Sequence, residues 1–393
     1  MDDIRDNFDG TNLKRFHMIT RKDLNNIQRD FRLINTEATN ISEVECVRMW
    51  VNSKKEMDHN PILHFKQQSE EDKTKYFEDD DFFLAIMTKA QKSILERFGN
   101  DIICVDSTHG TNSSDFFLIT LLVVDEFRCG FPVAFCISNK QDEHSLKKFF
   151  LAIKEKVGAI KCKTLMTDDA AAFHLAWNAV MSPSENVLLC SWHIDRAWRN
   201  QLKRIKGDNA KKALVYKSLR ALMEHNNMQN FTIAQNNVLA AMFSDEQTKD
   251  FAQYFKIHYA SRPEKWAFCF RSGCGINTNN HIESLHRVIK YIYFEGKKNK
   301  RIDRLLDILM KIVRDKIFER LIKLKKGHTC ERIKIIHERH DSSQLIPKDN
   351  VSKIAEEMWK MKKNDDSDEY YIIARNSLSF AVKCKMICLK CHI

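Results

Sequence analysis

Three acidic residues lie where a hydrolytic metal site would need them, although they are far apart in the chain. Asp106 closes the short β-rich run DIICVD, and Asp168 directly follows the apolar run TLMT. Glu283 opens a predicted helix within the stretch NTNNHIESLHRVIK. Carboxylate oxygens suit Mg²⁺ or Mn²⁺, and two such ions ~3.5–4 Å apart can clamp the attacking and leaving oxygens of a phosphoryl transfer. The three acids together therefore predict nuclease-like chemistry.

Each acid considered alone also has a purely structural explanation. Asn280 can cap a helix while Glu283, three residues later, reaches back to it, and an aspartate after a strand is often a turn or cap residue. In the run TDDA the second acid could be Asp168 or Asp169. We favour Asp168 because it follows the apolar strand directly, which leaves Asp169 to cap the next helix.

The elements around the first two acids predict a mixed α/β sheet. Three consecutive strands with short turns indicate an antiparallel meander, and two later strands alternate with helices, which requires right-handed crossovers in one sheet. The simplest packing is a five-stranded sheet in the order 3-2-1-4-5, whose ligand site would lie beyond the carboxyl ends of the strands. The predicted strands are residues 101–108, 116–126, 130–138, 161–169 and 186–194, and the helices between them are residues 143–158 and 170–181.

Helical patterns flank this sheet on both sides. Amphipathic stretches at residues 20–34 and 79–99 predict helices before it, and the strand pattern stops for about eighty residues after Ile194. The predicted divisions are an N-terminal helical region at 1–99, a core at 100–195 plus 276–325, a helical insertion at 196–275, C-terminal helices with a charged linker at 326–369, and a cysteine-containing segment at 370–393.

The predicted helix that carries Glu283 has two different sides. Its apolar side is formed by Ile282, Leu285 and Ile289, whereas Arg287 and Lys290 share the polar side with the acid. Such a helix can rest on the sheet and present Glu283 to the other two acids.

Composition limits the classes of protein that the chain can belong to. Its 393 residues suggest two or three domains, and the net charge of +11 is compatible with a polyanionic partner or with solubility alone. Lysine and arginine cluster at residues 203–206, 297–301 and 323–326, which favours a polyanionic partner.

The twelve cysteines without a secretory signal indicate reduced thiols. The longest apolar run, FFLITLLVV, is far shorter than the ~20 residues that span a bilayer, so no membrane partner is expected.

Four stretches in fixed order resemble the Mutator-like element (MULE) transposases. These stretches are DIICVDSTHGTN, TLMTDDAAAFHLAW, LLCSWHIDRAWR and NTNNHIESLHRVIK, and the resemblance covers roughly residues 80–300. It implies an RNase H-like core with a DDE triad and a helical insertion before the glutamate, which agrees with the predicted sheet. The catalytic acids that it implies are Asp106, Asp168 and Glu283, with Mg²⁺ or Mn²⁺ as cofactor. Residues that could contact DNA or support the acids are His109, Asp169, Cys190, His193, Asn280, Arg287 and Lys290.

Two cysteine-containing patterns raise the question of zinc. The family carries a Cys-x-x-His pair after its fifth strand, here Cys190 and His193, and on a strand these two would point to opposite faces. A small buried side chain is the simpler interpretation of Cys190. The C-terminal stretch CKMICLKCHI resembles the opening of a SWIM-type zinc motif, and Zn²⁺ is expected there only if the motif is completed. That incomplete motif consists of Cys384, Cys388, Cys391 and His392.

The resemblance implies a nuclear DNA transposase that acts on terminal inverted repeats and target DNA, in an active complex that is a homo-oligomer. Because the N-terminal DNA-recognition module of the family and the rest of the SWIM motif are not seen, the sequence predicts a truncated element copy, a partial gene model or a host-retained remnant. The alternative is a transposase-derived DNA-binding or regulatory protein without catalytic activity. A zinc enzyme built on Cys190 and His193 is a third interpretation, for which two ligands are too few.

Overall fold

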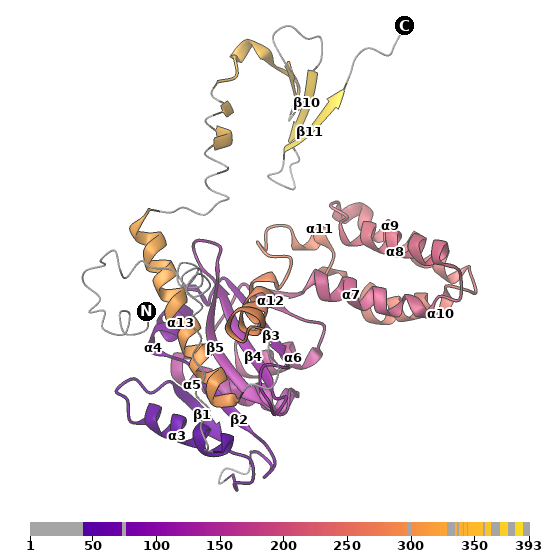
Figure 1. The fold of residues 1–393 in the computed structure, drawn as a ribbon. Helices are drawn as coiled ribbons and strands as arrows, with labels where there is room; N and C mark the ends of the chain where they lie inside the picture. Colours follow the sequence, from indigo (N-terminus) through magenta and orange to yellow (C-terminus); the bar gives the residue numbers. More distant parts are fainter. Residues whose placement is uncertain are drawn as a thin grey trace, which may run out of the picture. The chain divides into compact units, whose positions relative to one another are not determined.

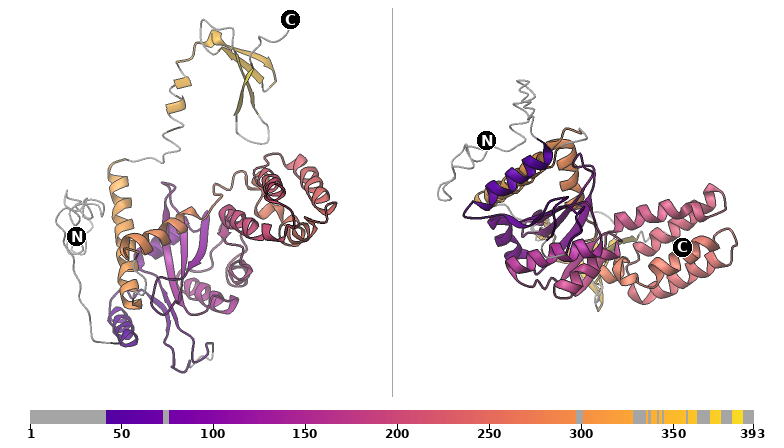
Figure 2. Two further views of the ribbon diagram at one scale, coloured as in Figure 1. Left: turned by 45° about the vertical axis from the view of Figure 1, so that its right-hand side comes forward. Right: turned by 90° about the horizontal axis from the view of Figure 1, so that it is seen from below.

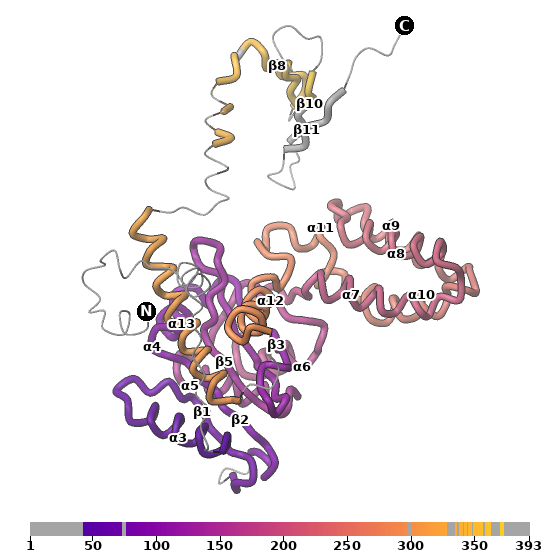
Figure 3. Tube along the Cα trace, viewed as in Figure 1, coloured from indigo at the N-terminus to yellow at the C-terminus, as the bar shows by residue number. Residues whose placement is uncertain are grey.

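The computed structural model describes residues 42–72, 76–296 and 301–327, together with shorter stretches between 335 and 387 (Figure 3). The chain divides into two units, Met1–His328 and Thr329–Ile393. The larger unit contains the candidate site. Among the described residues, none of the helices is both long and apolar enough to cross a bilayer.

A seven-stranded mixed sheet forms the centre of the larger unit, in the order β1-β2-β5-β4-β3-β6-β7 (Figure 1). The last five of these correspond to the five predicted strands in the predicted order 3-2-1-4-5, so the mixed α/β sheet is confirmed. β3 pairs in parallel with β6, and β6 with β7, whereas the other pairs are antiparallel. The strands are β1 (Ile62–Lys66), β2 (Phe83–Ile86), β3 (Ile102–Thr108), β4 (Phe117–Val124), β5 (Gly130–Ser138), β6 (Thr164–Thr167) and β7 (Asn186–Leu189).

The expectation of an entirely helical region over residues 1–99 is wrong for the strands β1 and β2. All four residues of β2 are buried, and a short continuous apolar run cannot be assigned to strand or helix by periodicity alone. The helix predicted over residues 79–99 begins only at Lys89, as α4 (Lys89–Phe98), where Thr88 and Gln91 form a capping box. The helix predicted at residues 20–34 lies outside the described residues.

Helices cover both faces of the sheet (Figure 2). On one face α5 (Glu143–Val157) packs against α6 (Ala171–Val180). On the other face lie α12 (Asn280–Arg287) and the long α13 (Ile302–Lys325), and α3 (Glu43–Lys55) packs beside α13. α12 therefore crosses the sheet on the face opposite to the crossover helices.

Between β7 and α12 the chain forms a helical projection with a hydrophobic core of its own (Figure 1). Trp198 is fully buried in it and packs edge-on against Phe255, Tyr259 and Trp266. The helices of this projection are α7 (Ser191–Gln201), α8 (Asn209–Met223), α9 (Met228–Phe243), α10 (Lys249–Phe255) and α11 (Phe268–Arg271).

The smaller unit contains a four-stranded antiparallel sheet in the order β11-β10-β9-β8. Its strands are β8 (Val351–Ala355), β9 (Met358–Lys362), β10 (Tyr370–Arg375) and β11 (Val382–Ile387). The prediction of helices and a linker over residues 326–369 is therefore wrong for β8 and β9, whose aromatic and β-branched residues favour strands. Of the incomplete zinc motif, Cys384 lies on β11, whereas Cys388, Cys391 and His392 lie outside the described residues.

A buried ion cluster fixes α13 to the turn between β4 and β5. Arg320, with only 8% of its side chain exposed, lies 3.1 Å from the Asp125 carboxylate and forms a two-pronged contact with Glu126. Asp125 is itself only 5% exposed. Because water is largely excluded from both groups, each charge is stabilised mainly by the other.

We predict that Arg320→Ala lowers the free energy of unfolding by about 3–5 kcal/mol, because Asp125 would keep a buried charge without its partner. Denaturant unfolding of the wild type and the variant measures the loss. Lys316→Ala on the same helix removes an exposed pair with Glu319 (3.4 Å) and should cost less than about 1 kcal/mol. Equal losses of stability in the two variants would contradict the conclusion that Arg320 and Asp125 form a buried ion pair.

Candidate active site at the carboxyl edge of the sheet

The parallel pairing of β3 and β6 brings two of the predicted acids side by side. Ile102 pairs with Thr164 and Cys104 with Met166, and continuing this register places Asp168 opposite Asp106. Asp106 is 5% exposed, and its Oδ1 accepts a hydrogen bond of 2.8 Å from the Ser107 amide. The carboxyl ends of neighbouring parallel strands thus carry one acid each, at the edge where ligands bind in such sheets.

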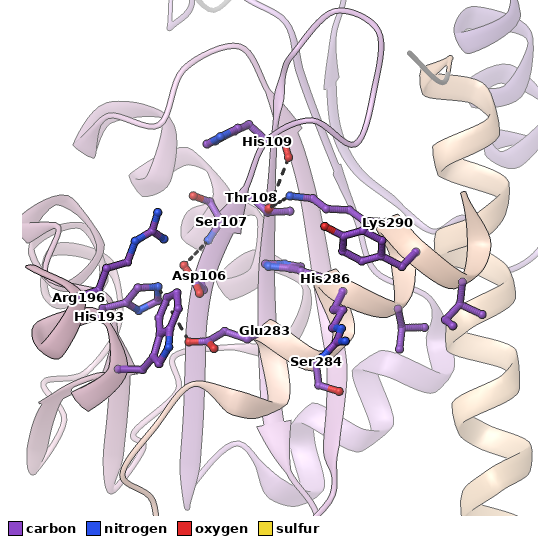
Figure 4. Close-up of a pocket in the computed structure, with 15 residues that line it drawn as sticks. Asp106, Ser107, Thr108, His109, His193, Arg196, Glu283, Ser284, His286 and Lys290 are labelled. Atoms are coloured by element: carbon purple, nitrogen blue, oxygen red, sulfur yellow. Dashed lines mark hydrogen bonds and ion pairs between the residues drawn. The ribbon is translucent and has the colours of Figure 1, made fainter. Parts of the chain in front are cut away.

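Glu283 reaches the same edge from α12. The predicted apolar side of this helix is buried on the protein, since Ile282, Leu285 and Ile289 are all less than a tenth exposed. The helix approaches β5 so closely that a Cβ at Gly130 would lie 2.6 Å from the Cβ of His281, so only glycine fits at that position. Figure 4 shows Glu283, Asp106 and His193 gathered at one end of a cavity.

The start of α12 differs from the predicted capping arrangement. Asn279, not Asn280, is the N-cap residue, and its side chain makes no capping hydrogen bond. Asn280 is exposed, so the capping explanation for Glu283 is wrong. Instead Glu283 turns toward the other acids and toward Cys190, whose Sγ lies 3.6 Å from Oε1.

Burial perturbs the titration of all three acids, and repulsion from the other two adds to its effect at Asp106. Burial, followed by the charges of Asp168 and Glu283, raises the pKa of Asp106 to about 8. Burial also raises the pKa of Asp168, although the Ala170 amide donates to it at 3.0 Å, and burial raises the pKa of Glu283. Carboxyl groups that resist ionisation in this way are suited to binding a divalent cation, which would offset their charge.

Two of the acids, Asp106 and Glu283, line a cavity of about 1140 Å³ whose walls are largely basic and aromatic, whereas Asp168 is not part of its lining. Lys290 donates a hydrogen bond of 2.6 Å to Thr108 Oγ1, and the guanidinium of Arg196 lies 5.4 Å from the ring of Trp192. This volume exceeds that of a typical small-molecule pocket and suits a polymeric substrate. The positively charged or imidazole side chains that line it are His109, His193, Arg196, His286, Arg287 and Lys290.

The two adjacent aspartates after β6 have different environments. Asp169 accepts hydrogen bonds from Tyr259 (2.9 Å) and from Arg262 (2.6 Å), both in the helical projection. Asp168 instead lies opposite Asp106 when the register of β3 and β6 is continued, and its charge raises the pKa of that residue. The geometry therefore places Asp168 with the acids and Asp169 at the junction between the sheet and the projection.

Cys190 and His193 lie differently from their predicted positions. The fifth strand was expected to extend to residue 194, but β7 ends at Leu189, and Cys190 is the N-cap residue of α7. In the first helical turn the two side chains lie on the same side rather than on opposite faces. His193 Nε2 is 4.0 Å from Glu283 Oε1, so both residues of the pair converge on the third acid.

The loop before α12 is tied to α7 through one carbonyl group. The amide and hydroxyl of Ser191 donate to the Asn277 oxygen at 3.2 and 3.0 Å, and Arg271 donates to the same oxygen at 2.9 Å. The Asn279 amide donates to Cys190 Sγ at 3.2 Å. These contacts hold the start of α12 against the start of α7.

Several residues of the site were not singled out from the sequence. Trp192 and Arg196 line the cavity from α7, and their i, i+4 spacing would have indicated a shared face if residues 191–201 had been assigned to a helix. His286 is buried and lies 3.0 Å from Thr120 Oγ1, and burial, followed by Lys290, lowers its pKa to about 3. A neutral histidine of this kind leaves no signal in the sequence.

Residues 63–174 match a family described as the RNaseH-like domain of zinc finger SWIM domain-containing protein 1/3. The match covers less than a third of the chain and extends from β1 into α6, so that it includes Asp106 and Asp168 but not Glu283. This region is therefore an RNase H-like domain similar to that of SWIM zinc-finger proteins. No curated protein matches the chain significantly.

Because the pKa of Asp106 is raised, the free energy of unfolding should depend on pH. In the unfolded chain this carboxyl titrates near 3.8 and in the folded protein near 8, so the folded state loses stability as pH rises from about 4 to about 8. Asp106→Asn removes this loss and should stabilise the metal-free protein by more than ~1 kcal/mol at pH 8, because one pKa unit corresponds to ~1.4 kcal/mol. Thermal unfolding in EDTA at pH 5 and pH 8 measures the difference, which should shrink at pH 5.

Asp101→Asn is the matched control. Asp101 is exposed and directly precedes β3, the strand that carries Asp106 near its carboxyl end. Its effect should not depend on pH over this range. A stabilisation by Asp106→Asn that is the same at both pH values would show that the carboxyl is not strained by its neighbours.

Substitution of Asp168 and substitution of Asp169 should have different effects on the free energy of unfolding. Asp169→Asn weakens the hydrogen bonds to Tyr259 and Arg262 and should lower the free energy of unfolding by about 1–3 kcal/mol. Asp168→Asn removes a charge from the acid cluster and should not destabilise the protein. Denaturant unfolding of the two variants at pH 7 makes the comparison, and a greater loss in Asp168→Asn would reverse the assignment.

Proposed function

We propose that this chain is the catalytic region of a DDE-type DNA transposase, with the Mutator-like element transposases as the class that it resembles. The observation that carries the proposal is the position of Asp106 and Asp168 at the carboxyl ends of neighbouring parallel strands of an RNase H-like sheet, with Glu283 near enough for its charge to raise the pKa of Asp106. Asp106 and Glu283 line one cavity with basic walls, which suits the cleavage of a polyanion, because the acids alone would repel its phosphates.

Asp106, Asp168 and Glu283 are the residues that would hold Mg²⁺ or Mn²⁺. When bound, such ions lower the pKa of a water molecule and offset the charge that develops on a phosphate. Arg196, Arg287 and Lys290 would contact the phosphates of the DNA backbone from the cavity wall, and Trp192 offers a surface on which a base could stack.

As long as its ring holds no metal ion, His193 is suited to moving a proton beside the acids. Burial, followed by the charge of Arg196, lowers its pKa, so the ring is neutral at physiological pH and becomes positively charged when it accepts a proton. Its Nε2 is the nitrogen that faces Glu283.

In the proposed reaction, water attacks a phosphodiester at the element end, which leaves a 3′-hydroxyl and a 5′-phosphate. The 3′-oxygen then forms a bond to a phosphorus of target DNA, and the 3′-oxygen of the target strand leaves with the proton. Each step exchanges one phosphorus–oxygen bond for another and requires no oxidant or reductant. The partners would be terminal inverted repeats and target DNA, the active complex a homo-oligomer and the location the nucleus.

A second function follows from the matched family. Its description names a SWIM zinc-finger protein and not a transposase, which favours a transposase-derived DNA-binding or regulatory protein without catalysis. Such a protein would use the same basic cavity for DNA, with an affinity that falls steeply with salt, but would cut nothing.

Nicking of a supercoiled plasmid in Mg²⁺ or Mn²⁺ separates these two functions. We expect the full chain to nick the plasmid, and we expect Asp106→Asn and Glu283→Gln to reduce the rate at least ~10²-fold without loss of folding, because each removes a metal ligand. Asp101→Asn should nick within about twofold of the wild-type rate.

Plasmid binding without nicking in either metal would support the regulatory function and reject the transposase. Nicking that survives in both Asp106→Asn and Glu283→Gln would place the activity elsewhere, or in a contaminant.

A further inference from the structure

We propose that Cys190, His193 and Glu283 form a binding site for Zn²⁺, with Sγ, Nε2 and Oε1 as the ligand atoms. The three residues come from the start of α7 and the first turn of α12, and their ligand atoms all lie within 4.8 Å of one another. Among the described residues, this is the group of histidine, cysteine and acidic side chains whose spacing suits a metal ion.

The distances fit a tetrahedral zinc ion after small movements. Zinc binds sulfur at ~2.3 Å and nitrogen or oxygen at ~2.0–2.2 Å, so its ligand atoms lie roughly 3.3–3.6 Å apart. Cys190 Sγ is already 3.6 Å from Glu283 Oε1, and His193 Nε2 is 4.0 Å from the same oxygen. The third pair, Cys190 Sγ and His193 Nε2, lies within 4.8 Å, so displacements of roughly 1 Å in the imidazole would bring all three pairs into the range for zinc.

The chemistry of the ligands selects zinc over the ions proposed for the acid triad. Mg²⁺ takes oxygen ligands and avoids sulfur, whereas Zn²⁺ accepts thiolate, imidazole and carboxylate together. A thiolate and a carboxylate supply two negative charges, which balance the charge of the ion.

Burial raises the pKa of the Cys190 thiol, but two features of its surroundings favour the thiolate that a metal ion would bind. The Asn279 amide donates to Sγ at 3.2 Å, and Sγ lies at the start of an eleven-residue helix, where the positive end of the dipole favours a negative charge. His193 and Glu283 also line the cavity, so the fourth zinc position would open toward it. Three protein ligands with one open position are the arrangement of catalytic rather than structural zinc sites.

The proposed zinc ion would share Glu283 with the acid triad. Only this link to catalysis rests on the proposed function, because the binding site itself needs no activity. A zinc ion bound to Oε1 of Glu283 would compete with the ions held by Asp106 and Asp168. Alternatively, the Glu283 carboxylate would bridge the zinc ion and those ions.

Cobalt titration of the full chain tests the site, with Co²⁺ as a spectroscopic probe in place of Zn²⁺. Cys384→Ser, Cys388→Ser and Cys391→Ser are introduced together beforehand, so that the C-terminal cysteines cannot contribute. We expect a thiolate-to-cobalt charge-transfer band that saturates at one Co²⁺ per chain and disappears when Zn²⁺ displaces the cobalt. In this background Cys190→Ser should abolish the band, and His193→Ala should weaken binding at least ~10-fold.

Glu283→Gln gives a second check if Cys190→Ser does not fold, since it should weaken binding while keeping the thiolate band. Asp106→Asn should leave the band unchanged even where it abolishes plasmid nicking, so the two proposals fail separately. A band that persists in Cys190→Ser, or the failure of Co²⁺ to bind stoichiometrically, would overturn the zinc site.

Discussion

The cost of ionising Asp106, which is buried near two other acids at one sheet edge, is the constraint on which the rest of this site depends. Asp106 is almost fully buried, and the charges of Asp168 and Glu283 add to the cost of ionising it. Such an arrangement persists only if the surrounding structure holds it. The parallel register of β3 and β6 fixes the two aspartates, and the buried side of α12, seated against Gly130, fixes the glutamate.

The helical projection contributes to the site through α7, its first helix, and through its connection to α12, the helix that follows it. α7 begins as soon as β7 ends, and α12 begins where the chain returns to the sheet, so both lie at the same edge. The carbonyl of Asn277 accepts hydrogen bonds from Ser191 and Arg271 and joins these helices. Asp169 anchors the far side of the junction to Tyr259 and Arg262. The projection thus sets the distance of Cys190 and His193 from Glu283.

The sequence predicted the five central strands and their order, because each strand is a short apolar run bounded by turn residues. It could not predict the early end of β7, since NVLLCSWHI remains apolar beyond Leu189 and only tertiary contacts make Cys190 a helix start. That one boundary decides whether Cys190 and His193 diverge or converge. β2 was missed for the same reason, because FLAI fits either a helix or a buried strand. The separation of Asp168 from Asp169 needed partners ninety residues away.

We propose that the three carboxyl groups bind divalent ions together. Anomalous scattering from crystals soaked in MnCl₂ shows where manganese binds. We expect at least one anomalous peak within ~2.0–2.4 Å of oxygens from Asp106, Asp168 and Glu283, and no such peak in crystals of Asp106→Asn. Peaks confined to other parts of the chain, with the three carboxyl groups too far apart to share ions, would contradict it.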